Sequence, residues 1–447
     1  MFENLNRHRM GQQVLTAAAI LVSTLLPADC SSMARACPFC VAPPQTWAEI
    51  LDDSEIVVVA ELIDVQTFDL ENRAVSRFRV THLHNCPGGQ RRAGTLRSGA
   101  VIVLPEYVEG EPGQTYLLTG QVRVPDLGPI ATYSDDASDG DPFRIVSQTK
   151  LQSDDSAGHT GPSGLPYLMP EFVDWDFPEP MSSAAIDYVL NGPSNTLPQR
   201  LRLPYYIGFL EHQDSTIAID AWGEFARSEY SDVKAVRDQL PLTNLRRWIA
   251  NSETFPERLG LYGMMLGLCG NENDAEFLLR QIDPQEDTKF RFGTEGLIGG
   301  YLLLTGRAGL QYLDHHRLRS SDASLDQLVA TVFAMRFIWS YEPKLISRDE
   351  LRRSLRQCLY QDDLQEMIIP DLARWQDWDA AFHLVELYDA SGDDRDGLRR
   401  AIREFMRHCA EQAEGEALLM AECFLADTSA AEQRDSLRQD NELGQPR

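Results

Sequence analysis

Basic charge is what this sequence has least of. Lysine occurs only at positions 150, 234, 289 and 344, and 41 Lys and Arg residues stand against 68 Asp and Glu residues, for a formal net charge of −27 at pH 7. A surface this acidic repels both nucleic-acid phosphates and anionic lipid headgroups. We therefore expect no nucleic-acid partner.

Catalytic motifs and long apolar runs are also missing. The chain contains no Gly-x-Ser-x-Gly, no His-Glu-x-x-His, no phosphate loop and no dinucleotide fingerprint. Acidic pairs are so numerous that none is singled out as a general acid/base couple. Beyond the N-terminus no segment offers the ~20 consecutive apolar residues of a membrane span. These absences predict a protein that is not an enzyme, that holds no cofactor and that has no membrane span after signal cleavage.

The N-terminus has the form of an export signal. Arg7, His8 and Arg9 precede the 13-residue apolar run VLTAAAILVSTLL, and Ala34-Arg35-Ala36 has the small-x-small form of a cleavage site. We predict a signal peptide over residues 1–36 and a periplasmic or extracellular protein that begins at Cys37. An uncleaved signal anchor and a lipoprotein are the alternatives.

Seven cysteines follow the predicted cleavage site, at positions 37, 40, 86, 269, 358, 409 and 423. The odd number leaves at least one thiol unpaired within the chain. The last four lie in apolar helical patterns and are expected to be buried as small hydrophobic residues.

Cys37-Pro38-Phe39-Cys40 is the most distinctive string in the sequence. Its spacing and its proline-aromatic interior are similar to a glutaredoxin active site, but no strand precedes it in the predicted mature chain. An exporting compartment permits disulfides. We expect a structural disulfide, either Cys37–Cys40 or one of the two with Cys86, and keep dithiol redox chemistry as the alternative.

His82 and His84 precede Cys86 at period-two spacing. If the strand continues through them, all three side chains share one face. Together with Cys37 and Cys40 they form a candidate zinc or copper ligand set, although two exposed histidines on a strand also occur without a metal.

The first third of the mature chain reads as β structure. Thr46 to Glu49 has capping-box spacing and opens a short helix to about residue 53. Alternating and β-branched patterns then predict strands at 55–65, 74–83, 100–104, 115–124 and 143–151, separated by Gly-rich turns. Five short strands without long helices between them predict a small closed β barrel or sandwich over residues 37–132. The polar, acidic stretch 133–180 is predicted to be a linker or loop.

Residues 181–427 are predicted to be an all-α array, and 428–447 a flexible tail. Ile217, Ala221 and Phe225 recur at helical spacing, Ser347 and Glu350 form a second capping box, and the apolar run around Gly299 suggests a helix packed closely at its glycines. Helices this short must stack to bury their apolar stripes, which favours HEAT-like pairs in an α-solenoid. An irregular helical bundle is the alternative.

The segments "SEIVVVAELIDV", "RFRVTHL" and "GQTYLL", with a cysteine at the predicted mature N-terminus, resemble a netrin-like or TIMP-like module of OB topology. The complete order is similar to uncharacterised exported proteins of planctomycete bacteria that end in HEAT-like helices. The TIMP resemblance implies protease inhibition through an N-terminal Cys-x-Cys, whereas this chain has two residues between its cysteines.

These observations predict an α+β multidomain protein that is exported and non-enzymatic. It would act as an interaction or scaffold protein of the cell envelope, and its helical array would bind a protein partner. The alternative is a periplasmic thiol/disulfide or metal-binding protein that uses Cys37, Cys40 and Cys86.

Overall fold

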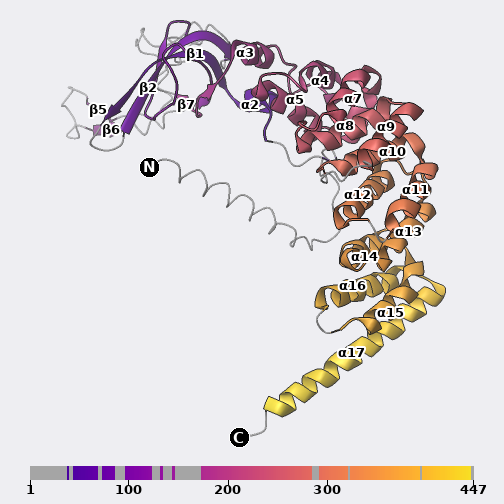
Figure 1. The fold of residues 1–447 in the computed structure, drawn as a ribbon. Helices are drawn as coiled ribbons and strands as arrows, with labels where there is room; N and C mark the ends of the chain where they lie inside the picture. Colours follow the sequence, from indigo (N-terminus) through magenta and orange to yellow (C-terminus); the bar gives the residue numbers. More distant parts are fainter. Residues whose placement is uncertain are drawn as a thin grey trace, which may run out of the picture. The chain divides into compact units, whose positions relative to one another are not determined.

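The structure is a computed structural model that describes residues 38–39, 44–68, 73–85, 96–122, 131–133, 143–145, 173–283, 291–320, 323–392 and 395–443. A region of antiparallel β-sheet is followed by a long series of α-helices (Figure 1). The predicted succession of a β region and a helical array is confirmed.

The main sheet is antiparallel, with the strand order β3-β2-β1-β4-β7, and β8 also pairs with β4. Its strands are β1 (Ile56–Phe68), β2 (Arg73–Asn85), β3 (Val101–Leu104), β4 (Thr115–Val122), β7 (Val173–Trp175) and β8 (Glu179–Pro180). Among the described strands β3 and β7 lie at opposite edges and do not pair with each other. These strands therefore form an open sheet, and the predicted barrel closure is not observed in them.

The strand predicted at 143–151 is shorter than expected and lies outside the main sheet. β5 (Ala131–Tyr133) and β6 (Phe143–Ile145) form a separate two-stranded sheet. The strand that extends the main sheet beyond β4 is instead β7, which comes from within the stretch 133–180. A three-residue strand carries little local signal, and its pairing with Gly120 to Val122 of β4 is what defines it.

Strand β1 is buried on both faces where it begins. Ile56, Val58 and Ala60 belong to the apolar core of the sheet. Val57 and Val59 belong to the larger core that the helices share. Because successive side chains of a strand point to opposite faces, the uninterrupted apolar run here shows that the sheet packs against the helical region on its second face.

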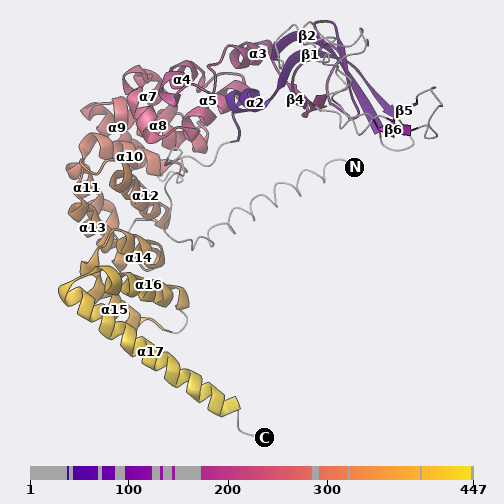
Figure 2. The ribbon, with the colours of Figure 1, turned by 180° about the vertical axis from the view of Figure 1, so that it is seen from behind.

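Apart from one helix that precedes the sheet, the helices follow one another along the chain, and many consecutive ones pack side by side (Figures 1 and 2). They are α2 (Trp47–Asp53), α3 (Ser183–Leu190), α4 (Gln199–Tyr206), α5 (Ser215–Arg227), α6 (Tyr230–Ala235), α7 (Leu242–Ala250), α8 (Pro256–Cys269), α9 (Glu272–Ile282), α10 (Thr294–Thr305), α11 (Arg307–Leu313), α12 (Leu325–Tyr341), α13 (Arg348–Gln357), α14 (Gln365–Arg374), α15 (Ala381–Ala390), α16 (Asp396–Gln412) and α17 (Gly415–Leu443). Alternate helices also pack together: α8 on α10, α10 on α12, and α14 on α16.

Glycines set the closest of these helix contacts. A Cβ atom at Gly263 of α8 would lie 2.6 Å from the backbone of Gly296 in α10, which no ordinary side chain tolerates. Gly267 and Gly300 meet in the same way one turn further on. The prediction that α10 is buried and packed closely at its glycines is confirmed.

The four cysteines of the helices differ in exposure. Cys358 and Cys409 are buried as predicted, Cys269 is half-buried, and Cys423 is exposed. Burial raises the pKa of the Cys358 thiol to about 12, so this thiol is unreactive. The prediction was wrong for Cys423, which lies on α17, the last helix of the array. None of the helices in the described parts of the chain is sufficiently long and apolar to cross a bilayer.

Candidate functional site

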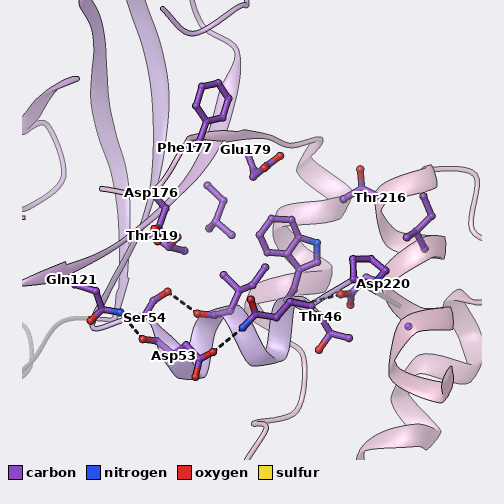
Figure 3. Close-up of a pocket in the computed structure, with 17 residues that line it drawn as sticks. Thr46, Asp53, Ser54, Thr119, Gln121, Asp176, Phe177, Glu179, Thr216 and Asp220 are labelled. Atoms are coloured by element: carbon purple, nitrogen blue, oxygen red, sulfur yellow. Dashed lines mark hydrogen bonds between the residues drawn. The ribbon is translucent and has the colours of Figure 1, made fainter. Parts of the chain in front are cut away.

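A cleft of about 650 Å³ opens where the sheet meets the helical region (Figure 3). Its walls come from α2 and the turn before it, from β4, from the β7–β8 segment and from α5. The lining residues are Pro44, Gln45, Thr46, Trp47, Ile50, Asp53, Ser54, Leu117, Thr119, Gln121, Asp176, Phe177, Glu179, Thr216, Ile219, Asp220 and Gly223. This volume lies within the ~300–1,000 Å³ that is usual for ligand pockets.

Helix α2 connects the two sides of the cleft. At its first turn, the backbone N–H of Trp47 donates to Oδ1 of Asp220 in α5 at 2.7 Å, and Glu49 Oε2 accepts from the backbone N–H of Thr46 at 3.0 Å. At its last turn, Nε2 of Gln121 in β4 donates to the backbone oxygen of Asp53 at 2.6 Å. The helix is therefore hydrogen-bonded to the helical region at one end and to the sheet at the other.

All of the charged residues in the lining are carboxylates. Asp53, Asp176 and Glu179 are exposed in the cleft, whereas Asp220 is buried at its inner wall. Figure 3 shows Asp176 and Glu179 on the sheet side and Asp220 on the helix side. None of the 17 lining residues is lysine, arginine or histidine. The cleft therefore presents negative charge only.

Two of the exposed carboxylates are held in place by neutral donors. Gln45 Nε2 donates to Oδ2 of Asp53 at 2.7 Å, and Thr119 Oγ1 donates to Oδ2 of Asp176 at 2.8 Å. The Glu179 carboxylate has no hydrogen bond or ion pair with any described residue. The Gln45 amide and the Thr119 hydroxyl are uncharged donors and do not neutralise the carboxylates they contact. The cleft carboxylates can therefore still bind a cation.

The cleft also has apolar walls that face solvent. Phe177, between β7 and β8, is 57% exposed, and Ile219 of α5 is 46% exposed. Large apolar side chains exposed within one concavity are typical of a pocket that contacts a ligand or partner.

Asp220 is the most perturbed acid of the site. It is 7% exposed, and Tyr188 Oη donates to its Oδ2 at 2.6 Å. Burial raises the pKa of Asp220 to about 6, although the hydrogen bonds from Tyr188 and from the Trp47 amide act in the opposite direction. Asp220 and Trp47 also line a second cavity of about 240 Å³ on the other side of α2.

One turn further along α5, Glu224 forms a buried ion pair with Arg202 of α4. Their side chains are 2% and 3% exposed, and Nη2 lies 2.6 Å from Oε2. Arg202 Nη1 also donates to Oδ1 of Asn195 at 2.6 Å. Burial raises the pKa of Glu224, and the arginine opposes that shift. This pair joins α4 to α5 and stands behind the cleft wall.

The lining contains no Ser-His or Cys-His pair. A nucleophile needs an adjacent base, but the lining contains no cysteine or histidine, and its one serine, Ser54, donates to the backbone oxygen of Ile50 at 2.6 Å. Both oxygens of Asp220 already accept hydrogen bonds from Trp47 and Tyr188.

Of the residues singled out from the sequence, those that the structure describes, His82 and His84, do not line this cleft. Cys37, Cys40 and Cys86 fall outside the described residues, so their disulfide or redox role stays a prediction. His82 and His84 are exposed on β2. His84 lines the smaller cavity, and partial burial together with the nearby His82 lowers its pKa. Within the described ranges no three His, Cys, Asp or Glu side chains are grouped as metal ligands.

Phe39, between the two cysteines of the N-terminal motif, contacts the helical array. It is 8% exposed, and its ring centroid lies 4.8 Å from that of Phe337 in α12. The ring occupies space that a side chain at Gly299 of α10 would take, and the Cβ and backbone oxygen of Phe39 lie against Gly260 of α8. Phe39 is therefore packed against α8, α10 and α12.

The cleft was not predicted from the sequence. The available signal was Asp220 and Glu224, two acids four residues apart beside the apolar stripe of α5. Acids at such positions are buried only when partnered, and here the partners come from α2, α3 and α4.

No protein-family model, curated protein or solved structure matches this chain.

Proposed function

We propose that this chain is an exported, non-enzymatic interaction protein of the cell envelope that binds a protein partner. The observation that carries the proposal is the cleft between sheet and helices, which is lined by both exposed carboxylates and exposed apolar side chains. Export rests on the N-terminal sequence, and the OB-like reading of the sheet rests on the quoted sequence segments.

The helical array supplies a scaffold for that site. Ion pairs link alternate helices: Arg246 of α7 with Asp274 of α9 at 2.6 Å, and Arg336 of α12 with Asp371 of α14 at 2.5 Å. Contacts between both consecutive and alternate helices are what stacked helix pairs produce, and they favour the HEAT-like reading over an irregular bundle.

A cleft variant tests the proposal. The full chain is expressed in an exporting host, and proteins crosslinked to it are compared for the wild type and for the triple variant Asp53→Asn, Asp176→Asn, Glu179→Gln. We expect a partner that the wild type captures and the variant loses. If the wild type and the variant captured the same partner equally, the cleft would not be the binding site.

The alternative is a thiol protein, and the anchoring of Phe39 favours it as a second candidate. Phe39, which lies between Cys37 and Cys40 in the sequence, is buried against the array. Measuring the intact mass with and without reductant and chelator distinguishes a structural disulfide from thiol or metal chemistry. A locked disulfide supports the structural role, whereas a readily reduced bridge or a bound metal supports thiol or metal chemistry.

A further inference from the structure

We propose that the cleft binds a basic, partly apolar peptide segment of another protein, in which lysine or arginine side chains meet the cleft carboxylates and an apolar side chain enters between the walls. This inference rests on the proposed function and specifies the chemistry of the partner.

The lining of the cleft is acidic. Asp53 at the end of α2 and Asp176 and Glu179 of the β7–β8 segment place three exposed carboxylates around one opening, and no lining residue is basic. Like charges gathered in a concavity are relieved by a cation, and a concave wall concentrates their field on whatever enters. The charge of the lining therefore selects a cationic ligand.

The cleft also has exposed apolar walls. Phe177 stands on the sheet side and Ile219 on α5, and both keep about half of their side chains exposed. A simple inorganic cation would leave this apolar surface in contact with water. A segment that contains an aliphatic residue beside a basic one covers both kinds of surface at once.

The chain's own neighbouring segment has the wrong charge to fill the cleft. Residues 134–172 precede β7 directly, and they contain seven Asp and Glu residues against two Lys and Arg residues. Together with the net charge of −27, this makes occupation by a segment of the same kind of chain unfavourable. The occupant comes from a different, basic protein.

Defined peptides test the inference. Fluorescence anisotropy is measured for a labelled ten-residue peptide of alternating lysine and leucine, and for two counterparts in which lysine is replaced by glutamate or leucine by serine. We expect the lysine-leucine peptide to bind and both counterparts to bind at least tenfold more weakly. Raising the salt concentration should weaken its binding further.

Matched variants assign the binding to the cleft. Neutralising the three cleft acids (Asp53→Asn, Asp176→Asn, Glu179→Gln) should weaken the lysine-leucine peptide roughly tenfold or more, since each exposed ion pair contributes a factor of about two to five. The control variant neutralises two aspartates and one glutamate on α15 and α17 (Asp389→Asn, Asp427→Asn, Glu422→Gln), which are also exposed. It changes the net charge equally and should leave the affinity within about twofold.

Phe177→Ser tests the apolar wall separately. It should weaken the lysine-leucine peptide and leave the lysine-serine peptide unchanged. Melting temperatures within a few degrees of the wild type show that every variant is folded.

Equal binding to the cleft variant and to the control variant would overturn the inference, because general attraction to an acidic surface would then explain the affinity. Equal binding of the lysine-leucine and lysine-serine peptides would overturn the proposed contact between an apolar side chain of the peptide and the cleft walls. If the basic peptide fails while a crosslinked partner still depends on the three cleft acids, the inference is wrong and the proposed function stands. If that dependence is absent as well, both fail.

Discussion

Replacing Gly299 by alanine should destabilise this protein, although the same change in a helix interior ordinarily stabilises by about 1 kcal/mol. The added methyl group would lie 2.7 Å from Cζ of Phe39 and 3.1 Å from its Cε2. Overpacking of this kind costs about 1–3 kcal/mol. After the helix-propensity gain, the net loss in the free energy of unfolding should be about 0–2 kcal/mol.

The sign should reverse when the ring is removed. In a Phe39→Ala background the nearest remaining atom to the methyl group at 299 is Phe337 Cδ1, at 3.3 Å. Gly299→Ala should then be neutral or stabilising by up to ~1 kcal/mol. The two substitutions should therefore show a coupling of about 1–3 kcal/mol.

Urea unfolding of the wild type, both single variants and the double variant measures this coupling, and hydrogen exchange of α10 reports whether the change is local. Gly208→Ala is the matched control, since a Cβ at Gly208 meets no atom within 4 Å. If Gly299→Ala has the same effect with and without Phe39, the N-terminal segment is not anchored in the array.

Three further outcomes follow from the site. Arg202→Met leaves the buried Glu224 carboxylate uncompensated and should lower the free energy of unfolding by about 3–5 kcal/mol, whereas adding Glu224→Leu should recover most of that loss; a double variant as unstable as the single one would contradict this. The raised pKa of Asp220 means that the native protein keeps a proton that the unfolded chain has lost between about pH 4 and pH 6. Its contribution to stability is therefore full below pH ~4 and is lost as the pH rises through about 6, and Asp220→Asn should flatten this part of the stability curve, on the order of 3 kcal/mol in urea titrations. Treatment with EDTA should leave the melting temperature of the wild type unchanged, and a fall of several degrees would indicate a bound metal.

Local pattern located most of the regular elements of the sheet region. The runs at 55–65, 74–83, 100–104 and 115–124 correspond to β1 through β4 within a few residues, because each carries enough β-branched or alternating residues to define itself. The capping box at Ser347 is also present, with Glu350 N–H donating to its Oγ at 3.3 Å. Such signals act over three or four residues and need no tertiary context.

Strands β7 and β8 could not be located in this way. They contain three and two residues and lie in a stretch whose composition indicates a linker. They are strands because β4 offers its edge to them. The same limit explains why a barrel was expected, since edge pairing depends on how far the whole sheet curves.

Composition and short-range periodicity record the acidic balance, the order of a β region before a helical array, and the lack of known catalytic motifs in the sequence. Where the charge acts depends on contacts between distant parts of the chain. Trp47 and Asp220 are 173 residues apart and meet at 2.7 Å. The cleft, the raised pKa of Asp220 and the anchoring of Phe39 all arise from desolvation and contact between such distant segments, which no local pattern records.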